Sequence, residues 1–233
     1  MMWIAGADAL DSALRNLQGG PVVRFFATQF DHARWEGFHF FDLIFPLFLF
    51  LIGVVIPISL ARLVEREGRA GALRRICTRA LVMYLLGLFY YGGLSTPFDQ
   101  IRLLGVLQRL ALCYFCAGLL FIYLRPRGLG VVCVGLLIGY WALLTFVPVP
   151  GFGAGDFSEK HNLSDWIDAH YLRGRKWNGD HDPEGLLSTL PAIATCLLGV
   201  FAGLLLRDPV RSEKQKVLLL ATTGALAVGL GLL

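Results

Sequence analysis

Cysteine is missing from the longest connection of the chain, residues 148–185. The five cysteines lie instead inside apolar blocks, at Cys77, Cys113, Cys116, Cys133 and Cys196. This distribution excludes an outer domain held together by disulfides. Cys113 and Cys116 match a C-x-x-C motif by spacing only, and buried cysteines usually behave as small apolar residues. Because no cysteine or histidine spacing matches a zinc pattern, we expect no metal site.

Long stretches of the chain also lack charge. The 18 residues from Leu43 to Leu60 carry no charged side chain, and a run of this length can cross a bilayer as a helix. Similar blocks recur, and hydrophobic residues make up 56% of the 233 residues. We therefore predict an all-α, polytopic transmembrane helix bundle that forms a single domain over residues 1–233. The predicted spans cover residues 43–60, 76–94, 103–124, 129–147, 186–206 and 217–233.

The two ends of the sequence lack polar flanks. Met1–Ala7 has the character of the end of an apolar helix, and Leu233 falls inside the last apolar block. A positively charged start, as in a signal peptide, is absent. We therefore expect the tail of an interrupted first helix, followed by about six spans that belong to a larger bundle.

Basic and acidic residues occupy different connections. Twelve of the 21 basic residues lie in three alternate connections, at 61–79, 125–127 and 207–216. Thirteen of the 17 acidic residues lie in the N-terminal stretch, the turn at 95–102 and the loop 148–185. The positive-inside rule then places segments 8–42 and 148–185 on the non-cytoplasmic side of a bacterial inner membrane. Nucleic-acid binding is not expected, since orientation and lipid headgroups explain the basic clusters.

A histidine precedes the first complete apolar block. His32 lies ten residues before Asp42, and both are close to the predicted membrane face, where ionisable groups are functional candidates. Histidine can serve as base, acid or nucleophile, and a carboxylate can orient its ring. We predict His32 and Asp42 as the catalytic pair, which requires the chain to fold back between them. The alternative is that His32 is a hydrogen-bonded interfacial side chain.

Two polar residues interrupt the third apolar block. Gln108 and Arg109 lie one or two turns inside an otherwise apolar helix, where a charge costs about 2–3 kcal/mol. One interpretation is that Arg109 extends to the outer interface, as long basic side chains do. The other is that both residues face an interior cavity, where Arg109 pairs with a carboxylate such as Asp42 or holds an anionic ligand.

The loop 148–185 is the only long connection, and its aromatic residues predict a small packed cap. Residues 164–172 have helical spacing, which predicts a short amphipathic helix on the outer membrane surface. The residues expected on its apolar face are Trp166, Ile167, His170 and Tyr171. Asp182 is expected to cap the next helix, with Glu184 in its first turn. The alternative is that either carboxylate faces the functional site.

Three ordered strings resemble signatures of the heparan-alpha-glucosaminide N-acetyltransferase family. The first is HARWEG at 32–37, followed by DLIFP at 42–46. The second is GVLQRL at 105–110. The third combines DPEGLL at 182–187 with LGVFAG at 198–203. Three matches in order are much more specific than any one of them.

This resemblance implies an integral membrane acyltransferase that moves acetyl from cytosolic acetyl-CoA to the amine of an amino sugar on the outer side. His32 matches the family's proposed catalytic histidine, and the cap at 148–185 would help to form the acceptor site. Asp8 is the nearest match to a polar residue near the end of the family's first helix. The implied partners are the lipid bilayer and the amino sugar, with acetyl-CoA as a co-substrate and no permanently bound cofactor.

The sequence does not decide whether the protein forms a homodimer. It also leaves open an alternative function, an amino-sugar transporter or permease of the inner membrane. Broken helices and polar groups at the membrane midplane mark that class. The polar groups here cluster toward the outer face, which favours an enzyme with an outer active site.

Overall fold

The computed structural model describes residues 20–33, 35, 37–93, 95, 97 and 100–231. Its described part is helical, with one isolated β-bridge between Val149 and Gly153. The elements are α2 (Pro21–Gln29), η1 (Phe40–Leu43), α3 (Ile44–Tyr90), α4 (Val106–Tyr123), α5 (Pro126–Phe146), α6 (Leu163–Tyr171), α7 (Thr189–Leu206) and α8 (Glu213–Gly231). The all-α prediction is confirmed for these residues. The chain divides into two compact units, Met1–Phe48 and Leu49–Leu233.

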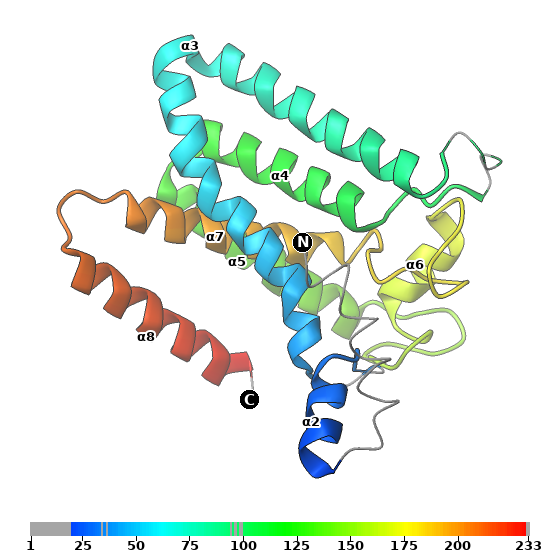
Figure 1. Ribbon diagram of the computed structural model, residues 1–233. Helices are drawn as coiled ribbons and strands as arrows, with labels where there is room; N and C mark the ends of the chain where they lie inside the picture. The colour runs from blue at the N-terminus through cyan, green and yellow to red at the C-terminus, as the bar shows by residue number, and fades with distance from the viewer. Residues whose placement is uncertain are drawn as a thin grey trace. The chain divides into compact units, whose positions relative to one another are not determined.

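Helix α3 covers most of two predicted spans, 43–60 and 76–94, and the connection between them, and it ends at Tyr90 (Figure 1). A straight helix of its 47 residues would be about 70 Å long, much longer than the ~30 Å hydrocarbon core of a bilayer. The backbone leaves helical geometry at Gly68, where φ is 72° and ψ is −178°, a conformation that essentially only glycine adopts. Pro57 lies within the helix and does not end it.

Helix α7 is central to the second unit and packs mainly on α5 and α4. It also approaches α3 very closely. A β-carbon on Gly53 would collide with the α7 backbone at Cys196 and Gly199, and one on Gly203 would collide with the α3 backbone at Val54. Small residues at such crossings let membrane helices approach each other closely.

Four helices among the described residues are long and apolar enough to cross a membrane: Phe40–Tyr90, Val106–Tyr123, Pro126–Phe146 and Thr189–Leu206. The last of these begins three residues later than the predicted span 186–206. Since α3 bends at Gly68 and each limb has more than the ~20 residues of a typical span, the count of about six spans stays a prediction.

The cap contains the predicted short helix, as α6, but its buried face is not the expected one. The side chains that α6 buries are those of Leu163, Ser164, Asp165 and Asp168. Tyr171, which was expected on the apolar face, is 67% exposed. The polar residues point inward because they bind backbone groups of the cap: Asn162 accepts from the Asp165 N–H, and Asp168 accepts from the Leu186 N–H.

Candidate active site

His32 and Asp42 meet in the first unit. The imidazole Nδ1 lies 2.6 Å from Asp42 Oδ1. The contact forms because the chain turns back after α2. The Phe40 N–H donates to Gln29 Oε1 across the turn at 3.1 Å. The fold-back that the sequence argument required is therefore present, and it places the two predicted catalytic side chains within hydrogen-bond distance.

The Asp42 carboxylate is held by the backbone of the same turn. Its Oδ2 accepts from the His39 N–H at 3.0 Å and from the Ala33 N–H at 3.3 Å. Oδ1 is therefore left to face the imidazole. The ring of Phe41 lies 4.6 Å from the His32 ring, centroid to centroid, and restricts it from another side. His32 is thus oriented by one carboxylate and one aromatic ring.

The contact with Asp42 determines which nitrogen of His32 can react. An ionised carboxylate only accepts hydrogen bonds, so Nδ1 carries the proton and Nε2 has the lone pair. Among the described residues, Nε2 makes no hydrogen bond. The His32 side chain is 68% exposed, against 27% for Asp42. The arrangement therefore presents a basic, nucleophilic nitrogen to an approaching reactant while a carboxylate supports the opposite side of the ring.

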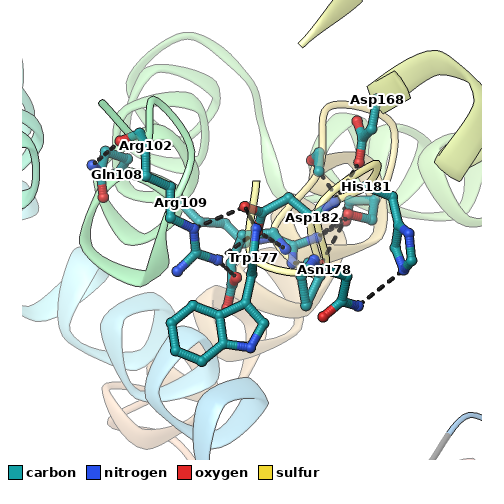
Figure 2. A network of polar contacts seen from close by, with 12 residues as sticks. Arg102, Gln108, Arg109, Asp168, Trp177, Asn178, His181 and Asp182 are labelled. Atoms are coloured by element: carbon teal, nitrogen blue, oxygen red, sulfur yellow. Dashed lines mark hydrogen bonds and ion pairs between the residues drawn. The ribbon is translucent and has the colours of Figure 1, made fainter. Parts of the chain in front are cut away.

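The other predicted site residues lie in the second unit, in a separate buried network (Figure 2). Arg102 donates through Nε and Nη2 to the two carboxylate oxygens of Asp182, at 2.8 and 2.5 Å, and through Nη2 to Glu184 at 2.5 Å. The prediction that Asp182 caps the following helix is wrong, because α7 begins at Thr189 with Ser188 as its N-cap residue. The paired carboxylates instead anchor the cap to the start of α4.

Aromatic rings enclose the Arg102 guanidinium. Its Cζ lies 5.0 Å from the Tyr91 ring centroid and 5.2 Å from that of Trp177. Burial by itself lowers the pKa of Arg102, but the hydrogen bond and charges of Asp182 and Glu184 outweigh it, so the pKa is raised above its ordinary value. Burial raises the pKa of Glu184, with a further contribution from Asp182, although the charge of Arg102 opposes this.

Arg109 points inward, so the first of the two interpretations, extension to the outer interface, is wrong. The residue is 7% exposed. Its guanidinium donates to the Pro183 carbonyl at 2.8 Å and to the carbonyl and hydroxyl of Ser188. Arg109 therefore binds the segment that leads into α7. Charged donors of this kind stabilise backbone carbonyls that no helix satisfies.

Gln108 is fully buried beside these arginines. Its Nε2 donates to the Arg102 carbonyl at 3.2 Å. Its Oε1 has no hydrogen-bond partner among the described residues and lies against Gly87. The side chain thus helps to position Arg102. Gln108 and Arg109 both face the interior, as the second interpretation of the sequence expected.

Sequence reasoning missed Arg102 and Asp168. Arg102 was counted only as part of a turn, and Asp168 only as a polar residue of the amphipathic helix. Asp168 is fully buried, and it accepts from the Leu186 N–H at 2.9 Å. A β-carbon on Gly185 would collide with its carboxylate. Of the two, only Arg102 could have been noticed in the sequence. It is a basic residue directly before an apolar block, and the loop 148–185 offers acidic residues that could pair with it.

The predicted site residues therefore form two groups. His32 and Asp42 belong to the first unit, and Gln108, Arg109, Asp182 and Glu184 to the second. Asp8 lies outside the described residues. Within the described part of the chain, no group of three His, Cys, Asp or Glu side chains could hold a metal ion.

Comparison with known proteins connects this arrangement to a family. No family model matches the chain. The human protein named heparan-alpha-glucosaminide N-acetyltransferase is 30% identical to it over 76% of this chain and 34% of its own length. The mouse protein of the same name is 29% identical over 76% of this chain and 35% of its own length. The chain is therefore a relative of the heparan-alpha-glucosaminide N-acetyltransferases.

The chain spans about a third of the length of these N-acetyltransferases. The four apolar helices of the described residues indicate a membrane protein. The sequence resemblance to this family is thus supported by the alignment as well as by the three short strings.

Proposed function

We propose that the protein is an integral membrane N-acetyltransferase that uses acetyl-CoA to acetylate the amine of an amino sugar. The relationship to the heparan-alpha-glucosaminide N-acetyltransferases supports the reaction class. The distribution of basic residues supports an orientation in a bacterial inner membrane with His32 and the loop 148–185 on the non-cytoplasmic side. Acetyl would then come from acetyl-CoA in the cytosol and reach an acceptor amine outside it.

One observation carries this proposal, the contact between His32 Nδ1 and Asp42 Oδ1 that leaves Nε2 open. Two routes use the same geometry. In the first, Nε2 attacks the thioester carbonyl, the C–S bond breaks, and CoA leaves as the thiolate. In the second, Nε2 removes a proton from the acceptor ammonium, and the free amine attacks the thioester directly. In both routes the imidazole becomes positively charged, and the Asp42 carboxylate stabilises that charge.

The second-unit residues have a supporting role in this proposal. Arg102, Arg109 and Gln108 direct their donors to protein groups at positions 102, 182–184 and 188. Their contacts hold the end of the cap next to the beginnings of α4 and α7. We infer that they keep the cap in the conformation that binds the acceptor.

Transfer across liposomes tests the function. The reconstituted protein receives labelled acetyl-CoA on one side of the membrane and glucosamine on the other. We expect labelled N-acetylglucosamine from the wild type and at least ~10²-fold less from His32→Ala. Lys214→Ala is the control, because Lys214 is an exposed residue of α8 that lies outside the cap and outside the His32 turn. Glucosamine that crosses unmodified would contradict the enzyme and favour the transporter.

A further inference from the structure

A second imidazole shares the turn that holds His32 and Asp42. The backbone N–H of His39 donates to Asp42 Oδ2 at 3.0 Å, and its ring Nδ1 lies 2.9 Å from the Asp31 carbonyl oxygen. The Asp31 carboxylate in turn accepts from the His32 N–H at 2.9 Å. One turn between Asp31 and Asp42 therefore orients two histidine rings.

The tautomer of His39 follows from its partner. A carbonyl oxygen can only accept a hydrogen bond, so Nδ1 of His39 carries a proton and Nε2 has the lone pair in the neutral ring. Nε2 makes no hydrogen bond to any described residue. A histidine whose Nδ1–H is held by a carbonyl is oriented with Nε2 ready to accept a proton or ligand. His39 is half-buried, whereas His32 is exposed.

The two rings differ in what supports them. The Nδ1–H of His32 faces a carboxylate, which stabilises a lasting positive charge such as that of an acyl-imidazolium. The Nδ1–H of His39 faces a neutral carbonyl, which orients the ring but contributes less to a cation. His32 therefore suits the attack on the thioester, and His39 suits the reversible uptake of one proton. The other ionisable groups described in this turn are Asp31 and Asp42.

We propose that His39 is a second catalytic residue, the base that takes the proton from the acceptor ammonium while His32 carries the acetyl group. This rests on the proposed function, and it assigns the nucleophilic route to His32.

The steps balance as follows. His32 Nε2 bonds to the acetyl carbon as the C–S bond breaks, and the CoA thiolate leaves. His39 Nε2 takes one proton from the ammonium. The resulting amine attacks the acetyl carbon, and the electron pair of the breaking C–N bond returns to His32. The amide nitrogen then loses its extra proton to solvent, and His39 releases the proton that it took up. The departed CoA thiolate takes one proton from solvent and becomes the thiol.

The simpler role for His39 is structural, because it is also the residue before the short helix η1. The two roles can be separated by substitution. In His39→Asn the amide nitrogen takes the position of Nδ1 and can still donate to the Asp31 carbonyl, but the basic Nε2 is gone. In His39→Ala both are lost. A structural role requires only the donor, whereas a catalytic role requires the base.

The experiment follows acetyl transfer by the reconstituted protein with two acceptors across a range of pH. With glucosamine at neutral pH, we expect His39→Asn to lower the turnover rate about 10²-fold. The rate should recover at alkaline pH, where the acceptor amine is neutral without a base. Hydroxylamine, which is neutral at pH 7, should restore transfer. Labelled acetyl should still accumulate on His32 when no acceptor is present. Lys214→Asn, at an exposed position of α8 outside the cap and outside the His32 turn, is the control and should keep the wild-type rate and pH profile.

Three outcomes would overturn the inference. A wild-type rate and pH profile in His39→Asn contradicts the catalytic role. Equal losses in His39→Asn and His39→Ala, with no recovery at high pH or with hydroxylamine, show that His39 does not remove the proton from the acceptor. If the wild type itself acetylates neither acceptor, the proposed function fails, and the role of His39 fails with it. The wild-type measurement therefore distinguishes failure of the function from failure of the inference.

Discussion

Two short contacts between a basic side chain and a carboxylate have nearly the same length and opposite surroundings. His32 and Asp42 meet at 2.6 Å with side chains that are 68% and 27% exposed. Arg102 meets Asp182 and Glu184 at 2.5 Å, with exposures of 6%, 0% and 13%. A contact distance therefore says little about what a charged pair does, because the pair's access to solvent differs so much between the two regions.

The difference has a physical consequence. Removing one partner of a buried pair leaves an uncompensated charge in a region without water, which strongly destabilises the fold. An exposed pair contributes little to stability because water solvates both partners. We therefore expect substitutions in the Arg102 network to affect folding first. Substitutions at the His32 turn should affect reaction rate and leave folding nearly unchanged.

The largest expected effect is that of Arg102→Met. The substitution leaves the buried carboxylates of Asp182 and Glu184 without their cation, so we expect the free energy of unfolding to fall by about 3–5 kcal/mol. Chemical denaturation in detergent measures this. Arg211→Met is the control, because its contact with Asp208 is 3.6 Å long and exposed; it should cost about 0–1 kcal/mol. Similar losses in both variants would remove the distinction between the two kinds of pair.

Asp42→Asn should affect rate much more than stability. The amide has nearly the size of the carboxylate, but it cannot balance a positive charge on His32, so we expect acetyl transfer to fall by about 10²-fold. The rate of labelled transfer and the denaturation midpoint are measured on the same preparation. Asp208→Asn provides a matched control, since Asp208 is outside the cap and lies 3.6 Å from Arg211 in another partly exposed pair. If Asp42→Asn unfolds the protein or leaves the rate of acetyl transfer unchanged, the exposed pair does not act mainly on the reaction rate.

Gly185→Ala tests how tightly the buried network is packed. A β-carbon at this position would collide with the Asp168 carboxylate, and overpacking of this kind costs about 1–3 kcal/mol. The unfolding free energy in detergent measures the loss. Gly135→Ala is the control, because it lies within α5 with open space around it. Alanine there should be neutral or stabilising by up to ~1 kcal/mol. Equal unfolding free energies for the two variants would show that the network around Asp168 is not tightly packed.

The smallest effect is a pH dependence from Asp168. Burial raises the pKa of Asp168 above its ordinary value of 3.8. A carboxyl of this kind stabilises the fold below its unfolded-state pKa, and this contribution is lost as pH rises through its folded-state pKa. The wild type should therefore lose stability relative to Asp168→Asn as pH rises above 3.8. Paired denaturation curves at several pH values measure the difference. A relative gain by the wild type would contradict a buried, destabilised carboxylate.

The sequence was sufficient for the helical class and for the catalytic pair as a hypothesis. Uncharged runs such as Leu43–Leu60 have few alternatives to a helix, since a bilayer satisfies no backbone hydrogen bond. The proximity of His32 to Asp42 was a conditional prediction. It depended on a chain reversal whose hydrogen bonds, such as that between the Phe40 N–H and Gln29, have no sequence pattern of their own.

The same reasoning failed at Asp182 and did not decide between the two interpretations of Arg109, for a specific reason. Asp182 followed by a proline and a glutamate has the composition of a helix start, and local rules cannot show that a more distant cation competes for the carboxylate. Arg102 lies 80 residues away in sequence. When several partners could bind one polar side chain, tertiary packing decides which of them does. The strongest available partner is therefore visible only in the folded chain.

The amino-acid sequence by itself determined where apolar helices form, where the bend at Gly68 is permitted and which ionisable residues border the apolar blocks, because these follow from local composition and backbone sterics. Only the tertiary structure decided that Arg102, Asp182 and Glu184 form a buried network while His32 and Asp42 stay accessible. Burial and partner choice depend on segments far apart in the chain, and the free energy of a charge depends on both.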